Sequence, residues 1–252
     1  MSKIIAVLNQ KGGVGKTTTT INMGAYLAKR GHSVLIVDLD PQGNATSGIG
    51  VDKQALDSTM YDVLFGTVTA EQIIKDTSSP NLHIVPSNAQ LAAAEVDLAG
   101  EQQREYRLKN AVSHLEYDYV LIDCPPSLGL LSINALTAAN SVLIPVQAEY
   151  YALEGLGQLL EIIQRVRQGL NPTLDLLGIV VTMYDGRTSL SDQVVQELKK
   201  HFGDKLFETI IPRNVRLAEA PSFGKSILEH DKWSKGARSY KNLAKEVESR
   251  AK

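Results

Sequence analysis

A short glycine-rich segment near the N-terminus constrains this chain more than any other feature. An apolar run at residues 4–8 precedes the segment, and a helical pattern at residues 17–30 follows it. Glycines let a backbone turn tightly and bring its N–H groups onto an anion, and a helix N-terminus adds partial positive charge there. The order strand, glycine loop, helix therefore predicts a phosphate-binding loop in an α/β fold. The segment is Lys11-Gly12-Gly13-Val14-Gly15-Lys16-Thr17.

The rest of the chain alternates short apolar runs with longer helical patterns. This alternation is typical of repeated β-α-β units, which bury a parallel sheet between helices. We therefore predict a single domain over residues 1–252: an α/β fold with a predominantly parallel twisted sheet and helices on both faces. Residues 44–80 are the least regular part, and we expect them to form an insertion over the sheet edge. The further predicted strands are 34–37, 82–85, 119–122, 142–146, 176–182 and 207–211, and the further predicted helices are 130–139, 152–167, 190–201 and 236–250.

Composition limits the classes of protein to which the chain can belong. Of its 252 residues, 43% are hydrophobic and 21% are charged, which is enough apolar material for a sizeable core. No apolar run reaches the roughly 18 residues that a membrane span needs, and we expect a cytoplasmic protein. A single cysteine, Cys124, excludes an internal disulfide and a cluster held by several cysteines.

Residue types in and beside the loop predict the chemistry of the site. Lys16 would contact the β- and γ-phosphates of a nucleotide, and Thr17 would offer its hydroxyl to Mg²⁺. Asp123 ends an apolar run, where a carboxylate can hold Mg²⁺. Asp40 follows the second strand, and we expect it to orient or deprotonate the attacking water and to belong to the metal site. Asp38 would either share that work or cap the following turn, and the residues alone leave both alternatives open.

The loop departs from the usual phosphate-loop pattern at one position. The pattern G-x-x-x-x-G-K-[ST] requires glycine at residue 10, where this chain has Gln10, and Lys11 is an additional cation. Lys11 cannot easily fold back onto phosphates that its own loop surrounds. We expect it to reach the nucleotide of a facing subunit, as an arginine finger does in trans. Lys11, Lys16 and Asp40 are therefore the predicted catalytic residues.

Three motifs show which family the chain resembles. They are KGGVGKTTT from residue 11, DLDPQGNAT from residue 38 and DCPPSLG from residue 123. Together they resemble the ParA/MinD group of P-loop NTPases, whose phosphate loop is called a deviant Walker A motif. Two more segments, residues 147–155 and 211–221, are similar to the chromosomal ParA (Soj) branch of that group.

This resemblance implies a DNA-segregation ATPase that uses ATP and Mg²⁺. In this family an ATP-bound, face-to-face homodimer binds double-stranded DNA without sequence specificity, and a ParB-like partner stimulates the slow hydrolysis that releases it. The expected location is the nucleoid, without membrane contact. By the same resemblance, Gly12 would lie at the dimer face, and Pro212 and Asn214 would border the adenine. The full set of expected nucleotide contacts is Lys11, Gly12, Gly13, Val14, Gly15, Lys16, Thr17, Thr18, Pro212 and Asn214.

A basic C-terminal third contains the candidate DNA contacts. Residues 180–252 carry 14 Lys and Arg against 10 Asp and Glu, whereas residues 1–179 have a net charge of −6. Charge alone leaves open whether this asymmetry marks an anionic partner or is ordinary surface variation. Arg187 and Arg216 match family positions implicated in DNA contact. The lysines Lys199 and Lys200 are weaker candidates, as are Lys235, Arg238 and Lys241, because a solvated helix face explains the lysines equally well.

A membrane-associated regulator of the MinD type is the main alternative, because it shares the loop. Such a protein would end in an amphipathic helix that lies on lipid. Here the apolar residues of the final predicted helix fit docking onto the protein body instead. Those residues are Tyr240, Leu243, Ala244 and Val247.

Overall fold

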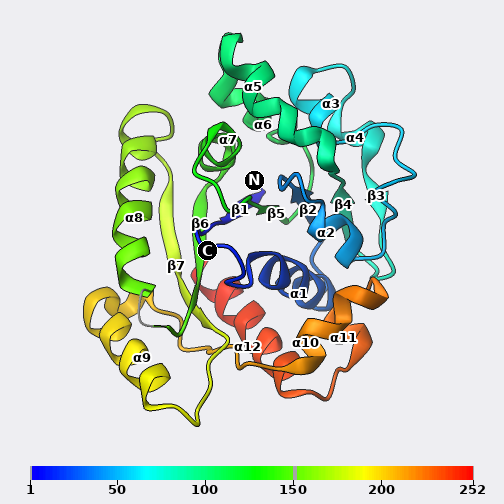
Figure 1. Cartoon of the computed structure of the whole chain (residues 1–252). Helices are drawn as coiled ribbons and strands as arrows, with labels where there is room; N and C mark the ends of the chain where they lie inside the picture. Colours follow the sequence, from blue (N-terminus) through cyan, green and yellow to red (C-terminus); the bar gives the residue numbers. More distant parts are fainter. Residues whose placement is uncertain (1, 150–151, 252) are drawn as a thin grey trace.

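The computed structural model describes residues 2–149 and 152–251, and a seven-stranded sheet forms its centre (Figure 1). The strand order is β3-β4-β2-β5-β1-β6-β7. Only β3 runs antiparallel to its neighbour within this sheet, so the predicted predominantly parallel α/β fold is confirmed. The strands are β1 (Lys3–Val7), β2 (Val34–Asp38), β3 (Lys75–Asp76), β4 (Leu82–Val85), β5 (Tyr119–Asp123), β6 (Ser141–Gln147) and β7 (Asp175–Thr182).

Helices cover both faces of the sheet, as predicted, and two separate apolar clusters form the core. In β5, Val120 and Ile122 belong to one cluster, whereas Tyr119 and Leu121 belong to the other. Successive side chains of a strand point to opposite faces, so every strand of the sheet except the short, exposed β3 supplies both clusters. The helices are α1 (Lys16–Lys29), α2 (Asn44–Gly48), α3 (Met60–Phe65), α4 (Ala70–Ile73), α5 (Ala94–Asp97), α6 (Arg107–Val112), α7 (Leu130–Ala138), α8 (Ala152–Gly169), α9 (Ser189–Phe202), α10 (Val215–Glu219), α11 (Ile227–His230) and α12 (Lys235–Arg250).

The C-terminal helix α12 docks on the body of the protein, next to α1 (Figure 1). Its side chains Tyr240, Leu243 and Val247 are buried in the same cluster as the apolar side chains of α1. Tyr240 Oη lies 3.1 Å from Thr19 Oγ1, which gives the buried phenol a hydrogen-bond partner. The predicted docking of the final helix is therefore confirmed.

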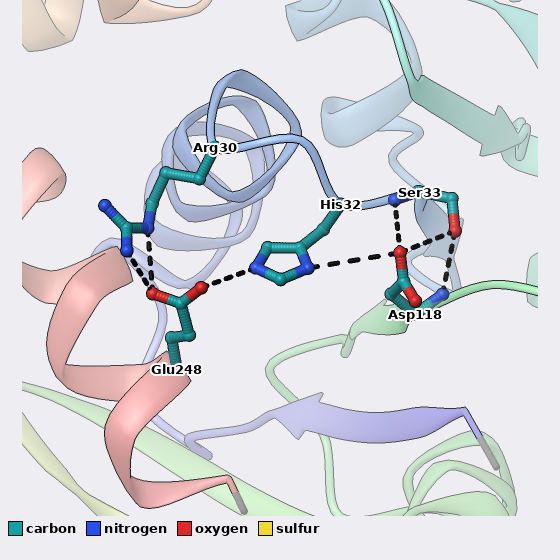
Figure 2. A network of polar contacts seen from close by, with 5 residues as sticks. All are labelled: Arg30, His32, Ser33, Asp118 and Glu248. Carbon is teal, nitrogen blue, oxygen red and sulfur yellow. Dashed lines mark hydrogen bonds and ion pairs between the residues drawn. The ribbon is translucent and has the colours of Figure 1, made fainter.

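A polar network joins α1 and α12 at the amino ends of the strands. Figure 2 shows His32 between two carboxylates: Nε2 lies 2.6 Å from Glu248 Oε1, and Nδ1 lies 3.9 Å from Asp118 Oδ2. Arg30 Nε also donates to Glu248, at 2.9 Å, and the Ser33 amide donates to Asp118, at 2.8 Å. Hydrogen bonds and charges from His32 and Arg30 lower the pKa of Glu248. The network thus connects the α1–β2 turn, the start of β5 and the last turns of α12.

The strand predicted at residues 207–211 is not formed, and this prediction was wrong. The Phe207 amide donates to the Ile179 carbonyl and the Ile211 amide donates to the Val181 carbonyl. These two bonds are four residues apart in this segment but only two residues apart in β7, so the segment does not stay in register with β7. The intervening Glu208 and Thr209 amides donate instead to the carboxylate of Glu246 in α12, at 2.9 and 3.0 Å. A side chain from another element therefore replaces the ladder partner that a strand would need.

Two regions are more regular than the sequence suggested. The predicted insertion over residues 44–80 contains α2, α3, α4 and the edge strand β3. Residues 87–118, for which we predicted no elements, contain α5, α6 and several short 3₁₀ turns. No helix of the described residues is long and apolar enough to cross a membrane. Tyr150 and Tyr151, which belong to the family-like segment 147–155, lie outside the described residues.

Candidate functional site

The glycine loop and the predicted carboxylates meet at the carboxyl ends of the central strands. Strand β5 lies between β1 and β2, so Asp123 is paired in register with Val7 on one side and with Asp38 on the other. The loop leaves β1 immediately after Val7. Sheet order alone therefore brings Asp38, Asp123 and the loop together, although they are separated by up to about a hundred residues of chain.

The loop backbone adopts conformations that require glycine at two positions. Gly13 and Gly15 have φ angles of 75° and 86°, in the left-handed region where a side chain would cause strain. Helix α1 starts directly after Gly15. Thr182, at the end of β7, donates its hydroxyl to the Val14 carbonyl at 2.8 Å, which anchors the middle of the loop. The first N–H groups of α1, which have no partner within the helix, therefore lie at the end of the loop.

A hydrogen bond joins Thr17, at the start of α1, to Asp123, at the end of β5. Thr17 Oγ1 donates to Asp123 Oδ2 at 2.7 Å, and Thr20 Oγ1 donates to the other carboxylate oxygen at 3.1 Å. Asp123 is fully buried, and burial raises its pKa, with the charge of Asp38 adding to this effect. A buried carboxylate between two hydroxyls and next to a second carboxylate is a favourable place for a hard cation with oxygen ligands.

Asp38 is bound within its own loop. Its Oδ2 accepts hydrogen bonds from the backbone and the hydroxyl of Thr46, at 2.8 and 2.7 Å, and its Oδ1 accepts one from the Asp40 amide at 3.1 Å. Burial raises the pKa of Asp38. Of the two roles left open by the sequence, this geometry favours the capping of the turn.

Asp40 and Lys16 lie on a cavity of about 240 Å³ at the mouth of the loop. Asp40 is 6% exposed, and its Oδ1 accepts the Gln42 amide at 2.9 Å. Lys16 Nζ donates to the Lys11 carbonyl at 3.2 Å. Burial lowers the pKa of Lys16, while the neighbouring Asp123 and Asp40 act in the opposite direction. The lining residues are Gly12, Gly13, Gly15, Lys16, Thr17, Thr18, Asp40, Gln42, Asn44, Pro126 and Met183.

A second cavity, of about 210 Å³, adjoins the first. Both are lined by Gly15, Thr18 and Met183. Pro212 and Asn214 contribute to the wall of the second cavity, together with side chains of α10 and Tyr240. A polar cavity followed by a more apolar one suits a molecule with a charged end and a flat aromatic end. The structure thus brings the distal candidates Pro212 and Asn214 to the same site as the loop.

Met183 was missed by the sequence analysis. It lines both cavities, and its φ of 50° places a residue with a side chain in the left-handed region. Such backbone conformations cluster at functional sites. No residue pattern predicts this conformation, because it depends on the position of the end of β7 beside the loop.

Lys11 does not line the loop cavity but forms an ion pair with Glu149. Its Nζ lies 2.7 Å from Glu149 Oε2, and about half of each side chain is exposed. Gln147 Nε2 donates to the other oxygen of Glu149 at 2.6 Å. Gln10, the residue that departs from the usual pattern, donates to the Gly155 carbonyl at 3.0 Å. Nothing in the local sequence around Lys11 indicates Glu149 as its partner.

The candidate DNA contacts come from separate elements. Arg187, in the β7–α9 loop, forms a two-point ion pair with Asp185, at 2.7 and 2.8 Å, which lowers the pKa of Asp185 to about 2. Arg216, in α10, is paired with Glu219 at 2.9 Å. The other candidates are exposed residues of α9 and α12: Lys199, Lys200, Lys235, Arg238 and Lys241.

The fold and the loop define a P-loop nucleotide-binding protein, and residues 2–176 match the family described as AAA domain. The sporulation initiation inhibitor protein Soj of Bacillus subtilis is 56% identical over 249 residues, which cover 98% of each chain. The chromosome partitioning protein ParA of Caulobacter vibrioides is 49% identical over 252 residues, covering 98% of this chain and 94% of that one. This chain therefore belongs to the Soj/ParA family of chromosome-partitioning ATPases.

A solved structure shows the same fold with a nucleotide. It is a Mycobacterium smegmatis protein described as cobyrinic acid a,c-diamide synthase with bound ADP and magnesium. The TM-score is 0.87 at 40% sequence identity, and the match covers 97% of this chain and 93% of that chain.

Proposed function

We propose that this chain is an ATP-dependent DNA-segregation ATPase whose ATP-bound homodimer binds double-stranded DNA without sequence specificity. The observation that carries the proposal is the pair of adjoining cavities on the loop, with Asp40 and Lys16 on one and Pro212 and Asn214 on the other. Their chemistry fits a nucleoside triphosphate. The relatives named above are partitioning proteins, which supports the cellular role.

The loop would bind the triphosphate of ATP through backbone N–H groups and the ammonium of Lys16. The buried start of α1 adds its dipole to this site. The adenine would occupy the second cavity, between Pro212 and the side chains of Thr18 and Leu217. Asn214 is held in place because its Oδ1 accepts the Leu217 amide at 3.3 Å.

Mg²⁺ would be held by the hydroxyl of Thr17 and by Asp123, with Asp40 close to the same site. The observed Thr17–Asp123 hydrogen bond already places both oxygens side by side. Across the described ranges, no group of three or more His, Cys, Asp or Glu forms a metal site. Few protein ligands are the usual situation for Mg²⁺ that is bound together with phosphates. The ion would neutralise charge that develops on the phosphate oxygens.

Hydrolysis requires a water molecule to attack the γ-phosphorus while the bond to the β–γ bridging oxygen breaks. Asp40 lies on the loop cavity and is the carboxylate that we assign to orient this water and accept its proton. Lys16 stabilises the negative charge of the transferring group. Lys11 of the facing subunit would complete the site, because the Lys11 ammonium is held outside its own loop cavity.

ATP would control DNA binding by controlling valency. A single protomer presents few basic contacts, whereas a dimer presents two sets at once, and the second contact then becomes intramolecular. Phosphate contacts of this kind depend on salt and carry no sequence information. Hydrolysis stimulated by a ParB-like partner would return the protein to protomers and release the DNA. The MinD-type alternative needs a lipid-binding C-terminal helix, and here the apolar face of α12 is buried in the core cluster it shares with α1.

The decisive experiment measures binding to a mixed-sequence DNA duplex with ATP, with ADP and without nucleotide, over a range of salt concentrations. We expect retention at moderate salt only with ATP. Equal retention with ADP and ATP would contradict the valency mechanism. Binding to anionic lipid vesicles with ATP, in place of DNA, would support the membrane alternative.

A further inference from the structure

Two exposed aromatic residues, Phe223 and Trp233, are linked through neighbouring residues to Arg216. Within the described ranges five large hydrophobic side chains are exposed, and three of them, Val215, Phe223 and Trp233, lie in one short stretch of α10 and α11 with their flanking turns. Phe223 is 64% exposed and Trp233 is 79% exposed. Large apolar side chains that cluster on a surface mark an interaction site more often than isolated ones do.

Ion pairs, one ring contact and one backbone hydrogen bond link Phe223 and Trp233 to Arg216. Asp231 Oδ2 lies 3.8 Å from Arg216 Nε, while its Oδ1 accepts the Trp233 amide at 3.1 Å. Glu219 pairs with Arg216 and lies 3.7 Å from His230 Nε2. The ring of Phe223 stacks on that of His230, with centroids 5.0 Å apart. Phe223 is thus linked through His230 to the Arg216–Glu219 pair, and the backbone of Trp233 is bound directly to Asp231 of the Arg216–Asp231 pair. We name this surface the aromatic edge, made of Arg216, Phe223, Lys232 and Trp233.

The segment of chain that carries the aromatic edge has a net positive charge. Residues 213–241 contain seven Lys and Arg against three Asp and Glu, a net charge of +4. Lys232 Nζ lies over the Trp233 ring, 5.3 Å from its centroid. A cation beside an aromatic ring that is open to solvent matches the surface of a nucleic acid, where phosphates alternate with apolar sugars. A purely apolar partner would leave these charges unpaired.

We propose that Trp233 and Phe223 contact the sugar–phosphate backbone of the double-stranded DNA that Arg216 binds. The inference rests on the proposed DNA-binding function and adds to it a second kind of contact. The indole N–H donates to a phosphate oxygen, the ring faces pack on deoxyribose, and Lys232 neutralises an adjacent phosphate. None of these contacts distinguishes one base from another, so they strengthen binding without creating sequence preference.

The same short helix connects this surface to the nucleotide site. In α10, Leu217 and Ala218 line the second cavity, whereas Val215 and Arg216 are exposed. At the start of α12, an added Cβ on Gly236 would lie 2.7 Å from Leu217 Cγ, so this glycine allows the two helices to pack closely. A bound adenine and a bound DNA duplex would therefore contact opposite sides of α10.

The chain has a built-in probe for the test, because Trp233 is its single tryptophan. The experiment titrates the full chain, with ATP and Mg²⁺, with a blunt mixed-sequence duplex that carries a fluorescent label. Label anisotropy reports DNA binding, and acrylamide quenching of tryptophan emission reports whether Trp233 is covered. We expect DNA to protect Trp233 from acrylamide in parallel with the rise in anisotropy. Trp233→Ala is expected to weaken DNA binding about five- to tenfold, the loss of about one hydrogen bond, while ATP-dependent dimerisation is unchanged.

A matched control moves the tryptophan to the opposite end of the molecule. Val96 in α5 is 76% exposed, and α5 lies far from α10 and α11 in Figure 1. In a Trp233→Phe, Val96→Trp variant, DNA should leave the quenching of the new tryptophan unchanged.

The outcomes separate the two proposals. DNA binding by anisotropy without protection of Trp233, or with unchanged affinity of Trp233→Ala, overturns the aromatic edge and leaves the proposed function standing. If ATP without DNA protects Trp233 from acrylamide, the aromatic edge is a contact between protomers, and this result would also overturn the inference. No ATP-dependent change in anisotropy would overturn the proposed function and this inference together.

Discussion

Lys11 Nζ and Glu149 Oε2 form an ion pair 2.7 Å long at the edge of the loop, outside the cavity in which the loop ends. About half of each side chain is exposed, and such pairs are typically worth at most about 1 kcal/mol. The pair is thus strong enough to orient Lys11 and weak enough to be exchanged for phosphates of a facing subunit. In the proposed dimer, Lys11 would leave Glu149 for those phosphates.

Glu149→Gln is expected to strengthen ATP-dependent dimerisation, because Lys11 no longer has to leave a carboxylate. Each homodimer exchanges two such pairs, and at most about 1 kcal/mol for each pair corresponds to a gain of up to about 30-fold in dimer affinity. Sedimentation in the presence of ATP, in an Asp40→Ala background that preserves the nucleotide, measures this affinity. Lys11→Ala is the control and should lose the dimer in both backgrounds. Weaker dimerisation of Glu149→Gln would show that Glu149 supports the interface instead of competing with it.

Gly12→Val is expected to separate nucleotide binding from dimerisation. An added Cβ at Gly12 meets no atom within 4 Å in the protomer, so the variant should fold and bind ATP like the parent. If Gly12 lies at the dimer face, the larger side chain will clash only with the second subunit. Calorimetry of ATP binding combined with sedimentation tests both expectations. A variant that still dimerises would remove Gly12 from the interface.

Thr17→Ala is expected to weaken the Mg²⁺ dependence of the ATPase. The Thr17 hydroxyl lies 2.7 Å from Asp123, and loss of an oriented group at a metal site typically costs about 10- to 100-fold in metal affinity. Titration of Mg²⁺ at constant ATP should show the shift in half-saturation. Thr17→Ser keeps the hydroxyl and should behave like the parent. Identical titrations for Thr17→Ala and the parent would rule Thr17 out as a ligand.

Asp40→Ala is expected to slow hydrolysis by about 10²- to 10⁴-fold, as is typical when a positioned base is removed. ATP binding should persist, because the loop and the Thr17–Asp123 pair are unchanged. Since the nucleotide is retained, the dimer should remain on DNA longer. Single-turnover hydrolysis and DNA dissociation rates measure the two effects. Normal turnover of the Asp40→Ala variant would show that another residue acts as the base.

Glu248→Gln is expected to lower stability at neutral pH. His32 and Arg30 lower the pKa of Glu248 in the folded protein, so this carboxylate contributes stability above its ordinary pKa. That contribution is lost as the pH falls through the lowered value. We expect a decrease of about 1 kcal/mol, or a few degrees in Tm, near pH 7, and a smaller difference in acid. Thermal unfolding of both proteins between pH 3 and pH 7 tests this, and a difference that grows in acid would contradict it.

Local patterns predicted most of the sheet and the loop. The apolar runs of β1, β2, β4, β5, β6 and β7 were recognisable because strands buried on both faces are continuously apolar. The segment 207–211 is apolar at Phe207, Ile210 and Ile211 but polar at Glu208 and Thr209, and it forms no strand. The amides of its two polar residues donate to Glu246, which lies far along the chain, and no local pattern contains that information.

Part of the candidate site could likewise be predicted from the sequence, and part depends on the tertiary structure. Residue types and spacing by themselves determined the loop and the roles expected for Lys16, Thr17 and Asp123, because a phosphate cradle depends on glycine conformations and on a helix start, both of which are local. Only the tertiary structure decided that Asp38 is bound by Thr46, that Glu149 holds Lys11, and that Met183 adopts a positive φ between the two cavities. These relationships depend on which strands are neighbours in the sheet and on where each one ends. The order β2-β5-β1-β6-β7 is a property of the packed chain as a whole.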